Sequence, residues 1–291
     1  MSDYLIKGET LTEIANAIRG KTGGTSPIRT QDFATEIEGI QAGGGGGDID
    51  GLIEGTIREV TSNATKVKNY VFQYCTYLKS VNLPNATSIG QEGFDSCNNL
   101  ENVNAPNVKS IGTYAFRNCY HLQTANFPLI TSVPKNAFSN CREMTTANMP
   151  LITSIGNSAF SYCVELIDID FPNVTTIGTY AFNECKLITT ADFPLATSVP
   201  NNAFTNCESL VTADFPLATS IGTRAFYGCY NLTSVNLPNA TSIGTDAFYN
   251  CYNNLTSINL PKIAGTVGSN AFGYCRKLSS IYLPKASTIA S

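Results

Sequence analysis

The residues of this sequence that could carry out chemistry are ten cysteines, a single histidine and a regular set of aspartates. Structural zinc sites need pairs of ligands a few residues apart, and no C-x-x-C occurs, so the spacing argues against a metal centre. Equivalent residues of stacked repeats lie about 4.8 Å apart, a separation that a disulfide could span. A phenylalanine stands three residues before each cysteine, and we therefore interpret the cysteines as buried free thiols. They recur every 22 residues, with a last interval of 24, at Cys75, Cys97, Cys119, Cys141, Cys163, Cys185, Cys207, Cys229, Cys251 and Cys275.

The single histidine, His121, leaves a Ser-His-Asp or Cys-His mechanism with only one candidate base. It follows Tyr120 at a position that varies between repeats, and we interpret it as a solvated surface residue. The carboxylates are scattered and form no obvious acid–base pair. We therefore predict that the protein is not an enzyme and that it uses no cofactor.

Four aspartates interrupt a polar pattern that otherwise uses asparagine. Asp170, Asp192 and Asp214 occupy one position in consecutive repeats, and Asp168 stands two residues before Asp170. Like charges this close repel each other, so the set is either a water-screened cluster or a site for a cation or a basic partner, calcium being the ion that suits oxygen ligands. A flat column cannot wrap calcium without added loops, which favours the screened cluster. Our hypothesis is that the four aspartates mark a ligand-facing surface.

A second set of candidate ligand-facing residues stands beside the cysteines. Tyrosine and arginine are enriched at recognition surfaces, because tyrosine supplies contact area and a hydroxyl at little cost in rotamer entropy. Arginines and asparagines accompany these tyrosines. The predicted ligand-facing tyrosines are Tyr120, Tyr162, Tyr227, Tyr230, Tyr249 and Tyr252.

The element that must position all of these residues is a repeat of 22 residues, clearest in LTSVNLPNATSIGTDAFYNC, from Leu232 to Cys251. A period of this length predicts a solenoid, in which stacking of the repeats builds the core. Alternating apolar residues predict a short strand at 233–237, and Pro238 ends it. We expect 245–249 to form a single helical or 3₁₀ turn that points Phe248 inward.

Glycine and phenylalanine each form a further column. Glycine recurs at the position of Gly244, but Pro134 and Pro200 replace it in two repeats and require a negative φ there. Close packing therefore explains these glycines better than a left-handed turn does. The phenylalanines are predicted to be core residues: Phe94, Phe116, Phe138, Phe160, Phe182, Phe204, Phe226 and Phe248.

The consensus L-x-x-V-x-L-P-x-A-T-S-I-G-x-x-A-F-x-x-C resembles the BspA-like leucine-rich repeats over residues 55–291. The resemblance implies a solenoid with a parallel β-sheet on one side, found mainly in bacterial surface or secreted proteins. One departure concerns the asparagine or cysteine that leucine-rich repeats usually carry three residues after the last strand leucine. This chain has apolar residues there, such as Ala86 and Val108, so we do not expect that buried asparagine ladder.

Three regions are expected along the chain. Residues 1–42 are predicted to form a small module of two amphipathic helices, and residues 4–24 resemble tail-associated prophage modules of Gram-positive bacteria, which suggests an attachment role. Residues 43–54 contain five consecutive glycines and are predicted to be a flexible linker. The solenoid occupies 55–291, with a degenerate capping half-repeat at 55–77. The last repeat lacks the half that would cover it, so we expect it to pair with another chain, such as a second copy, or to be covered in a larger assembly.

The net charge is −4, and no basic stripe is present to follow phosphates, so we expect no nucleic-acid partner. No apolar run has membrane-spanning length, and the start of the chain lacks the basic-then-apolar order of a secretion signal. We expect synthesis in the cytoplasm, with release in a phage particle or non-classical surface display. We therefore interpret the chain as a binding or adhesion module of a bacterial or prophage-encoded repeat protein, which presents an extended surface to a protein or glycan. The alternative is a rigid spacer in a phage tail or cell-surface assembly.

Overall fold

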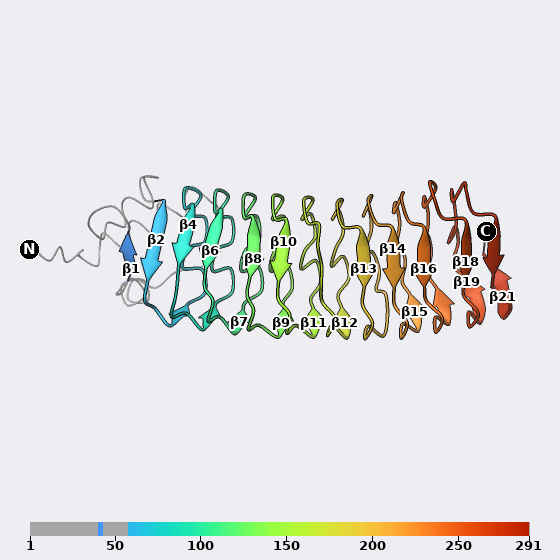
Figure 1. Cartoon of the computed structure of the whole chain (residues 1–291), viewed down its shortest axis with the longest axis horizontal. Helices are drawn as coiled ribbons and strands as arrows, with labels where there is room; N and C mark the ends of the chain where they lie inside the picture. Colours follow the sequence, from blue (N-terminus) through green and yellow to red (C-terminus); the bar gives the residue numbers. More distant parts are fainter. Residues whose placement is uncertain (1–39, 43–57, 291) are drawn as a thin grey trace, which may run out of the picture.

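The computed structural model describes residues 40–42 and 58–290, and these form a solenoid of stacked coils (Figure 1). Most coils contain two short strands and one turn segment. The first strands are β2 (Glu59–Ser62), β4 (Ser80–Asn82), β6 (Asn102–Asn104), β8 (Thr124–Asn126), β10 (Thr146–Asn148), β13 (Thr190–Asp192), β14 (Thr212–Asp214), β16 (Ser234–Asn236), β18 (Ser257–Asn259) and β20 (Ser280–Tyr282).

The first strands pair in parallel with no shift in register, so equivalent residues of successive coils lie side by side. Their outer residues, such as Thr212 and Asp192, face solvent or are half-buried, and the central residue, such as Ala213, is buried. This confirms the predicted strand with one buried face. The ladder is not continuous, however, because it runs in the separate groups β2-β4-β6, β8-β10, β13-β14-β16 and β18-β20.

A second parallel ladder, which we did not expect from the sequence, follows the corner made by the proline. Its residues are the Ser-Ile pairs of the repeat, such as Ser242 and Ile243, and the isoleucine points into the core. The strands are β3 (Lys66–Val67), β5 (Ser88–Ile89), β7 (Ser110–Ile111), β9 (Ser132–Val133), β11 (Ser154–Ile155), β12 (Thr176–Ile177), β15 (Ser220–Ile221), β17 (Ser242–Ile243), β19 (Gly265–Val267) and β21 (Ala286–Ile289).

The predicted helical or 3₁₀ turns are wrong: the described residues contain no helix, and this segment is a series of turns. In one coil, the N–H groups of Tyr114, Phe116 and Asn118 donate to carbonyls of the next coil. Those of Ala115 and Arg117 instead donate to the carbonyl three residues earlier. Two residues per coil, here Tyr114 and Asn118, have φ of 60°, which breaks the helical hydrogen-bond pattern and directs alternate donors toward the neighbouring coil.

The core confirms the predicted phenylalanine column. The eight rings from Phe94 to Phe248 are fully buried, and Phe72 and Phe272 extend the stack at either end. Neighbouring ring centroids lie 5.0–5.6 Å apart, with interplanar angles of 3–12°. The position expected to lack an asparagine ladder holds buried apolar side chains, including Ala86 and Val108. Stacking of the coils thus supplies the core that a single repeat cannot form.

The glycine column confirms the close-packing interpretation. A Cβ built on Gly222 would lie 2.5 Å from the amide nitrogen of Asn201 and 2.6 Å from the carbonyl carbon of Pro200. Gly156 meets the backbone of the preceding coil in the same way. Neither glycine has a positive φ, so the constraint on both is the approach of the adjacent backbone.

At the N-terminal side, the structure corrects the end of the predicted helical module. Strand β1 (Ile40–Ala42) pairs antiparallel with β2, so residues 40–42 are not helical. The pairing supplies backbone partners to the edge of β2, which has β4 on its other side. The rest of the predicted helical module and the glycine linker lie outside the described residues.

Candidate functional site

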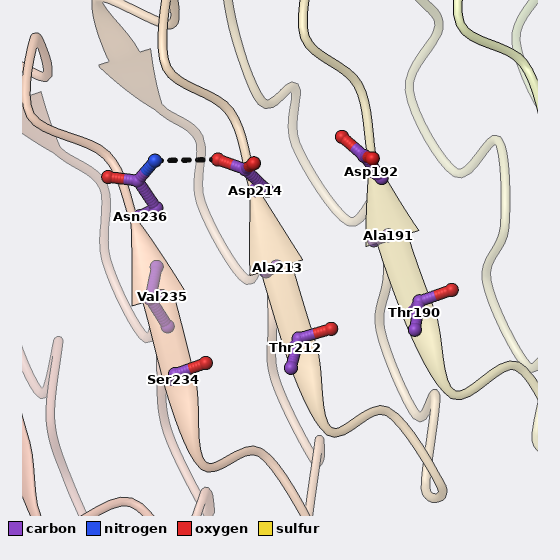
Figure 2. Close-up of a pocket in the computed structure, with 9 residues that line it drawn as sticks. All are labelled: Thr190, Ala191, Asp192, Thr212, Ala213, Asp214, Ser234, Val235 and Asn236. Carbon is purple, nitrogen blue, oxygen red and sulfur yellow. Dashed lines mark hydrogen bonds between the residues drawn. The ribbon is translucent and has the colours of Figure 1, made fainter.

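The predicted aspartate surface forms a shallow groove across β13, β14 and β16 (Figure 2). Asp192 and Asp214 lie side by side in register, and Asn236 continues the same row. A parallel row contains the hydroxyls of Thr190, Thr212 and Ser234, and the central residues Ala191, Ala213 and Val235 lie between the two rows. We call the nine residues the aspartate groove.

The amide side chains of this column form the ladder expected between neutral residues. Asn104 donates to Asn82 over 2.7 Å, and Asn148 donates to Asn126 over 2.8 Å. Within the groove, Asn236 Nδ2 donates to Asp214 Oδ1 over 2.7 Å. An aspartate cannot donate to the next member when it is ionised, so the ladder stops between Asp214 and Asp192.

The other two predicted aspartates do not join the groove. Asp168 makes one isolated parallel bridge to Thr146, and Asp170 lies outside any strand. The expected unbroken row of three aspartates is therefore interrupted. The interruption lies where the inward-facing side chain of the first strand changes: this coil has Ile169, and the adjacent coils have alanine at the same position.

Tyrosines gather on the turn side of the last three coils. Tyr227 and Tyr249 are stacked, with ring centroids 5.2 Å apart and an interplanar angle of 3°. The ring of Tyr274 lies 5.1 Å from that of Tyr249, and the rings of Tyr230 and Tyr252 are also 5.1 Å apart. We call these five residues the tyrosine ladder.

Charged groups surround the ladder. The guanidinium of Arg224 lies 5.4 Å from the ring centroid of Tyr227, and that of Arg276 lies 5.9 Å from the ring of Tyr252. Burial and the carboxylate of Glu208 raise the pKa of Tyr230. Partial desolvation raises the pKa of Tyr249, and its neighbours Tyr274 and Tyr227 raise it further. The ladder is therefore a neutral aromatic surface with cations on its margin.

The other two predicted tyrosines lie apart from the ladder. Tyr120 is half-buried and has Arg142 over its ring at 5.0 Å. Tyr162 is exposed in the coil of Cys163 and makes no ring contact that would join it to another aromatic residue of the described chain. The sequence thus identified the residue types, and the structure groups four of the six tyrosines together with Tyr274, which also stands beside a cysteine.

The structure places the remaining candidates for chemistry as follows. His121 is exposed and lies 2.7 Å from a carboxylate oxygen of Glu143. All ten cysteines are free thiols, and those from Cys97 to Cys251 are buried, in agreement with the interpretation as core residues.

Within residues 40–42 and 58–290, no cluster of three or more histidine, cysteine or acidic side chains is arranged to hold a metal ion. In the same residues, no helix has the length and apolar character needed to cross a membrane.

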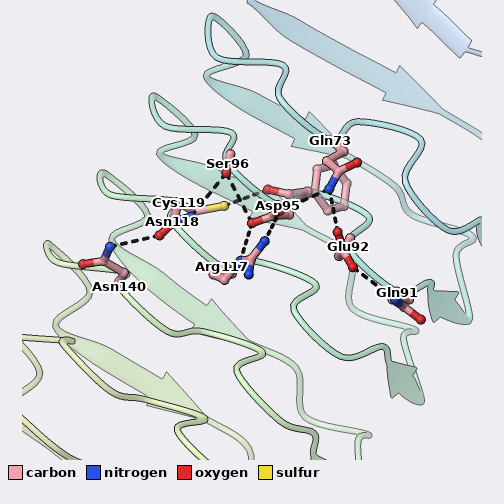
Figure 3. A network of polar contacts seen from close by, with 10 residues as sticks. Gln73, Gln91, Glu92, Asp95, Ser96, Arg117, Asn118, Cys119 and Asn140 are labelled. Atoms are coloured by element: carbon pink, nitrogen blue, oxygen red, sulfur yellow. Dashed lines mark hydrogen bonds and ion pairs between the residues drawn. The ribbon is translucent and has the colours of Figure 1, made fainter. Parts of the chain in front are cut away.

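A buried polar network was missed from the sequence (Figure 3). Arg117 donates from Nε and Nη2 to the two carboxylate oxygens of Asp95, over 2.9 and 2.7 Å. The Asp95 side chain is fully buried, and it also accepts bonds from Gln73 and Ser96. This carboxylate raises the pKa of Arg117. The available signal in the sequence was a pair of opposite charges 22 positions apart, because residues one repeat apart become neighbours in the solenoid.

Exposed leucines on the corner after the first strand were also missed. In several coils an asparagine at this corner, such as Asn173, donates to the carbonyl of the strand-ending proline of the preceding coil. Other coils carry an exposed leucine instead, at Leu129, Leu151, Leu195 and Leu217. Comparison of this position across the repeats would have shown the alternation between asparagine and leucine.

Comparison with known proteins agrees with the architecture. The BspA type leucine rich repeat region matches in six copies, over residues 65–189, 131–253 and 197–291. A leucine rich cell surface protein from Faecalibacterium prausnitzii is 24% identical, with a TM-score of 0.43, over 78% of this chain and 84% of that chain. A leucine-rich repeat protein from Bacteroides ovatus is 22% identical, with a TM-score of 0.37, over 78% of this chain and 79% of that one.

A leucine rich repeat protein from T. pallidum is 22% identical, with a TM-score of 0.41, over 61% of this chain and 85% of that chain. No curated protein sequence matches the chain. The family match covers well over half of the sequence and coincides with the stacked coils. The chain therefore belongs to the BspA-type leucine-rich repeat family.

Proposed function

We propose that this chain is a non-enzymatic binding module of a bacterial or prophage-encoded repeat protein, and that it presents the tyrosine ladder to a protein or glycan. The observation that supports the proposal is the gathering of five tyrosines on three adjacent coils, with Arg224 and Arg276 at their margin. Clustered tyrosine and arginine are typical of interface hot spots.

The order of the ladder supports the proposal energetically. Stacked rings such as Tyr227 and Tyr249 have already lost much of their side-chain freedom before a partner arrives. Fixing a rotamer-rich side chain on binding costs about 0.5–1.5 kcal/mol, so a preorganised surface retains more of its contact energy. Because Tyr227 and Tyr249 cover each other's faces, this pair offers ring edges and hydroxyls, which suits a partner with hydrogen-bonding groups.

The aspartate groove is the second surface of the proposal, and it suits a basic group. Asp192 brings a carboxylate that receives no hydrogen bond within the groove, next to the carboxylate of Asp214. Both are accessible from solvent. A lysine or arginine side chain of a partner would reduce the repulsion between them.

Binding arrays of bacterial cell-wall glycans and extracellular matrix proteins test the proposal, followed by titration of each hit. The double variant Tyr230→Ala, Tyr252→Ala should weaken binding at least about tenfold, which corresponds to 1.4 kcal/mol. Tyr162→Ala is the matched control, because this tyrosine is exposed and lies outside the ladder, and it should leave the affinity unchanged. Loss of binding in Asp192→Asn, with none in the tyrosine variant, would assign the contact to the groove instead.

The alternative function is a rigid spacer in a phage tail or cell-surface assembly. The regular stack of phenylalanine rings favours it, because every coil is fixed to the next by the same contact. A spacer needs no ligand, so the absence of any saturable partner in the arrays would support this function over binding.

Pairing through the last coil remains part of the proposal. Strands β20 and β21 each pair on one side only, and Ile281 and Ile289 are exposed although the equivalent Ile258 and Val267 are buried. Light scattering at rising concentration tests pairing with a second copy. An Ile281→Lys variant should remain monomeric, and a parent that stays monomeric throughout would contradict self-association.

A further inference from the structure

We propose that the aspartate groove and the two exposed leucines beside it form one docking surface, and that its partner is a protein segment with both apolar and basic side chains. The inference rests on the proposed binding function, and it names the class of partner for the groove. It adds to the groove a feature that the proposed function does not use, the corner that follows the first strand. We call the two leucines on that corner, Leu195 and Leu217, the leucine pair.

The leucine pair is joined directly to the aspartate groove. Figure 2 shows Asp192 at the end of β13, where the chain leaves the sheet. The N–H of Ala196 then donates to the carbonyl of Phe193 over 3.1 Å, which closes a four-residue turn with Leu195 as its third residue. The coil of β14 has the same turn, with Leu217 in the equivalent place. Each of the two coils therefore presents a carboxylate and, three residues later, an exposed leucine.

The fold does not require leucine at this corner. Where the corner carries an asparagine, its side chain joins two coils, as Asn239 does when it donates to the carbonyl of Pro216 over 2.6 Å. A leucine side chain cannot make this bond, and those of Leu195 and Leu217 are 42% and 47% exposed to water. The two coils thus lose a hydrogen bond between neighbours and leave apolar surface uncovered. Apolar side chains in the place of a stabilising contact indicate a surface that a partner covers.

An apolar residue also stands at the other edge of the groove. Val211 directly precedes β14, and its side chain is 37% exposed. Between Val211 and Leu217, the groove presents the hydroxyl of Thr212 and the carboxylate of Asp214. The coil of β14 therefore has apolar surface on both sides of its polar groups, which suits a bound protein segment better than a single ion.

The carboxylates of the groove are not neutralised by the described part of the chain. The ion pairs of residues 58–290 involve neither Asp192 nor Asp214, and Asp214 accepts one side-chain hydrogen bond, from Asn236. A lysine or arginine of a partner would pair with these carboxylates. The aliphatic part of the same side chain would pack against the leucine pair.

The combination of leucines and carboxylates selects a polypeptide as the partner. Nucleic acids and anionic membrane surfaces are negatively charged, so the aspartates would repel them. A glycan has few apolar groups with which to cover the leucines. A polypeptide places aliphatic and basic side chains next to each other on one chain, and in an extended segment successive side chains point to opposite sides. One side of such a segment would face the leucine pair and the other the groove.

Titration of the full chain with synthetic peptides tests the proposal. Three fluorescently labelled peptides of equal length are compared: one alternates lysine with leucine, one alternates lysine with serine, and one alternates glutamate with leucine. The lysine–leucine peptide should bind saturably, and the other two should bind at least about tenfold more weakly. Added salt should weaken the binding, because it screens the carboxylates. If no peptide binds, or if the lysine–serine peptide binds as tightly as the lysine–leucine peptide, the proposal is wrong.

Variants taken from the repeat itself locate the contact. The double variant Leu195→Asn, Leu217→Asn introduces the residue that this corner carries in other coils, so it should fold, and it should bind the lysine–leucine peptide at least about tenfold more weakly. The matched control is Leu129→Asn, Leu151→Asn, because these leucines are also exposed but their strands end in asparagine, and its affinity should stay within about twofold of the parent. Circular dichroism checks the fold of both variants. An equal loss of affinity in the two variants would overturn the assignment.

The peptide titration decides this inference separately from the proposed function, which is tested on the array hits with the tyrosine variants. A chain that binds an array hit through the tyrosine ladder and binds none of the peptides keeps the proposed function and loses the inference. A chain that binds the lysine–leucine peptide through the leucine pair supports the inference whatever the arrays show.

Discussion

Arg117→Ala should destabilise the second and third coils by leaving a buried carboxylate without its cation (Figure 3). Asp95 is 0% exposed and receives two charge-assisted hydrogen bonds from Arg117, whose side chain is 34% exposed. Removing one partner of a buried ion pair costs about 3–5 kcal/mol. Gln73 and Ser96 would still donate to Asp95 over 3.2 and 3.3 Å, and water could enter beside the alanine. We therefore expect the lower end, about 3 kcal/mol.

Arg224→Ala is the matched control for this substitution. Arg224 also pairs with an aspartate one coil away, Asp246, but through a single bond of 3.1 Å, and its side chain is 54% exposed. The Asp246 side chain is 12% exposed, but Arg224 is more open to water than Arg117 and makes one bond instead of two, so the control should lose less than the Arg117 variant, about 1 kcal/mol. Adding Asp95→Asn to the Arg117 variant should recover part of the loss, because a neutral amide is less costly to bury than an unpaired charge.

Urea unfolding followed by circular dichroism measures the overall loss for each variant. Solenoids can unfold in parts, so hydrogen exchange of the Phe94 and Phe116 amides should accompany it as a local measurement. Faster exchange is expected there in the Arg117 variant. A loss below about 1 kcal/mol, or one no larger than that of Arg224→Ala, would refute the argument that the buried carboxylate depends on this arginine.

Four further outcomes are expected. Phe160→Ala should cost about 3–5 kcal/mol in urea unfolding, because the ring is fully buried between two stacked neighbours, and a loss below about 1 kcal/mol would contradict its core role. Gly222→Ala should cost about 1–3 kcal/mol by the same measurement, because its Cβ would meet backbone atoms, and an unchanged midpoint would contradict close packing. Asp192→Asn should raise stability by about 0.2–1 kcal/mol, more at low salt, by removing the repulsion from Asp214; no gain at any salt concentration would show that water screens the pair fully. Iodoacetamide should label Cys275 faster than Cys75 near neutral pH, because burial raises the pKa of Cys75 to about 12 whereas the neighbouring Cys251 lowers the pKa of Cys275; equal labelling rates would contradict this difference.

The repeat made the columns of the solenoid predictable, because a constant period places equivalent residues side by side whatever the shape of the coil. The burial of Phe160 and Cys163, the outward faces of Thr212 and Asp192 and the packing of Gly222 all follow from that period. The proline substitutions were informative because they excluded a positive φ at the glycine position.

The turn segment could not be assigned from the same reasoning. The spacing of Ala247, Phe248 and Cys251 is compatible with a helix. The residues whose left-handed backbone prevents a helix include Tyr114 and Arg224, and neither residue type indicates a positive φ in a sequence. A weak signal was present before the cysteines, where asparagine or glycine recurs, as at Asn206 and Gly228. Both residue types tolerate a left-handed backbone.

The groove and the ladder were only partly predictable, since neither depends on the repeat itself. The sequence placed Asp170 in line with Asp192 but could not show that the strand ladder stops at Ile169. It identified Tyr249 but not its contact with Tyr274. Beside this contact lies Gly273, where a Cβ would meet the Tyr249 ring at 2.7 Å.

The alternating hydrogen bonds of the turn segment have a mechanical consequence. The two strand ladders and the turn segment each join one coil to the next by bonds that run along the solenoid axis. A force that pulls the two ends apart would therefore load these bonds lengthwise and open them one coil at a time, rather than shear many together. The protein should therefore lengthen in steps of one repeat under tension, at nearly constant force.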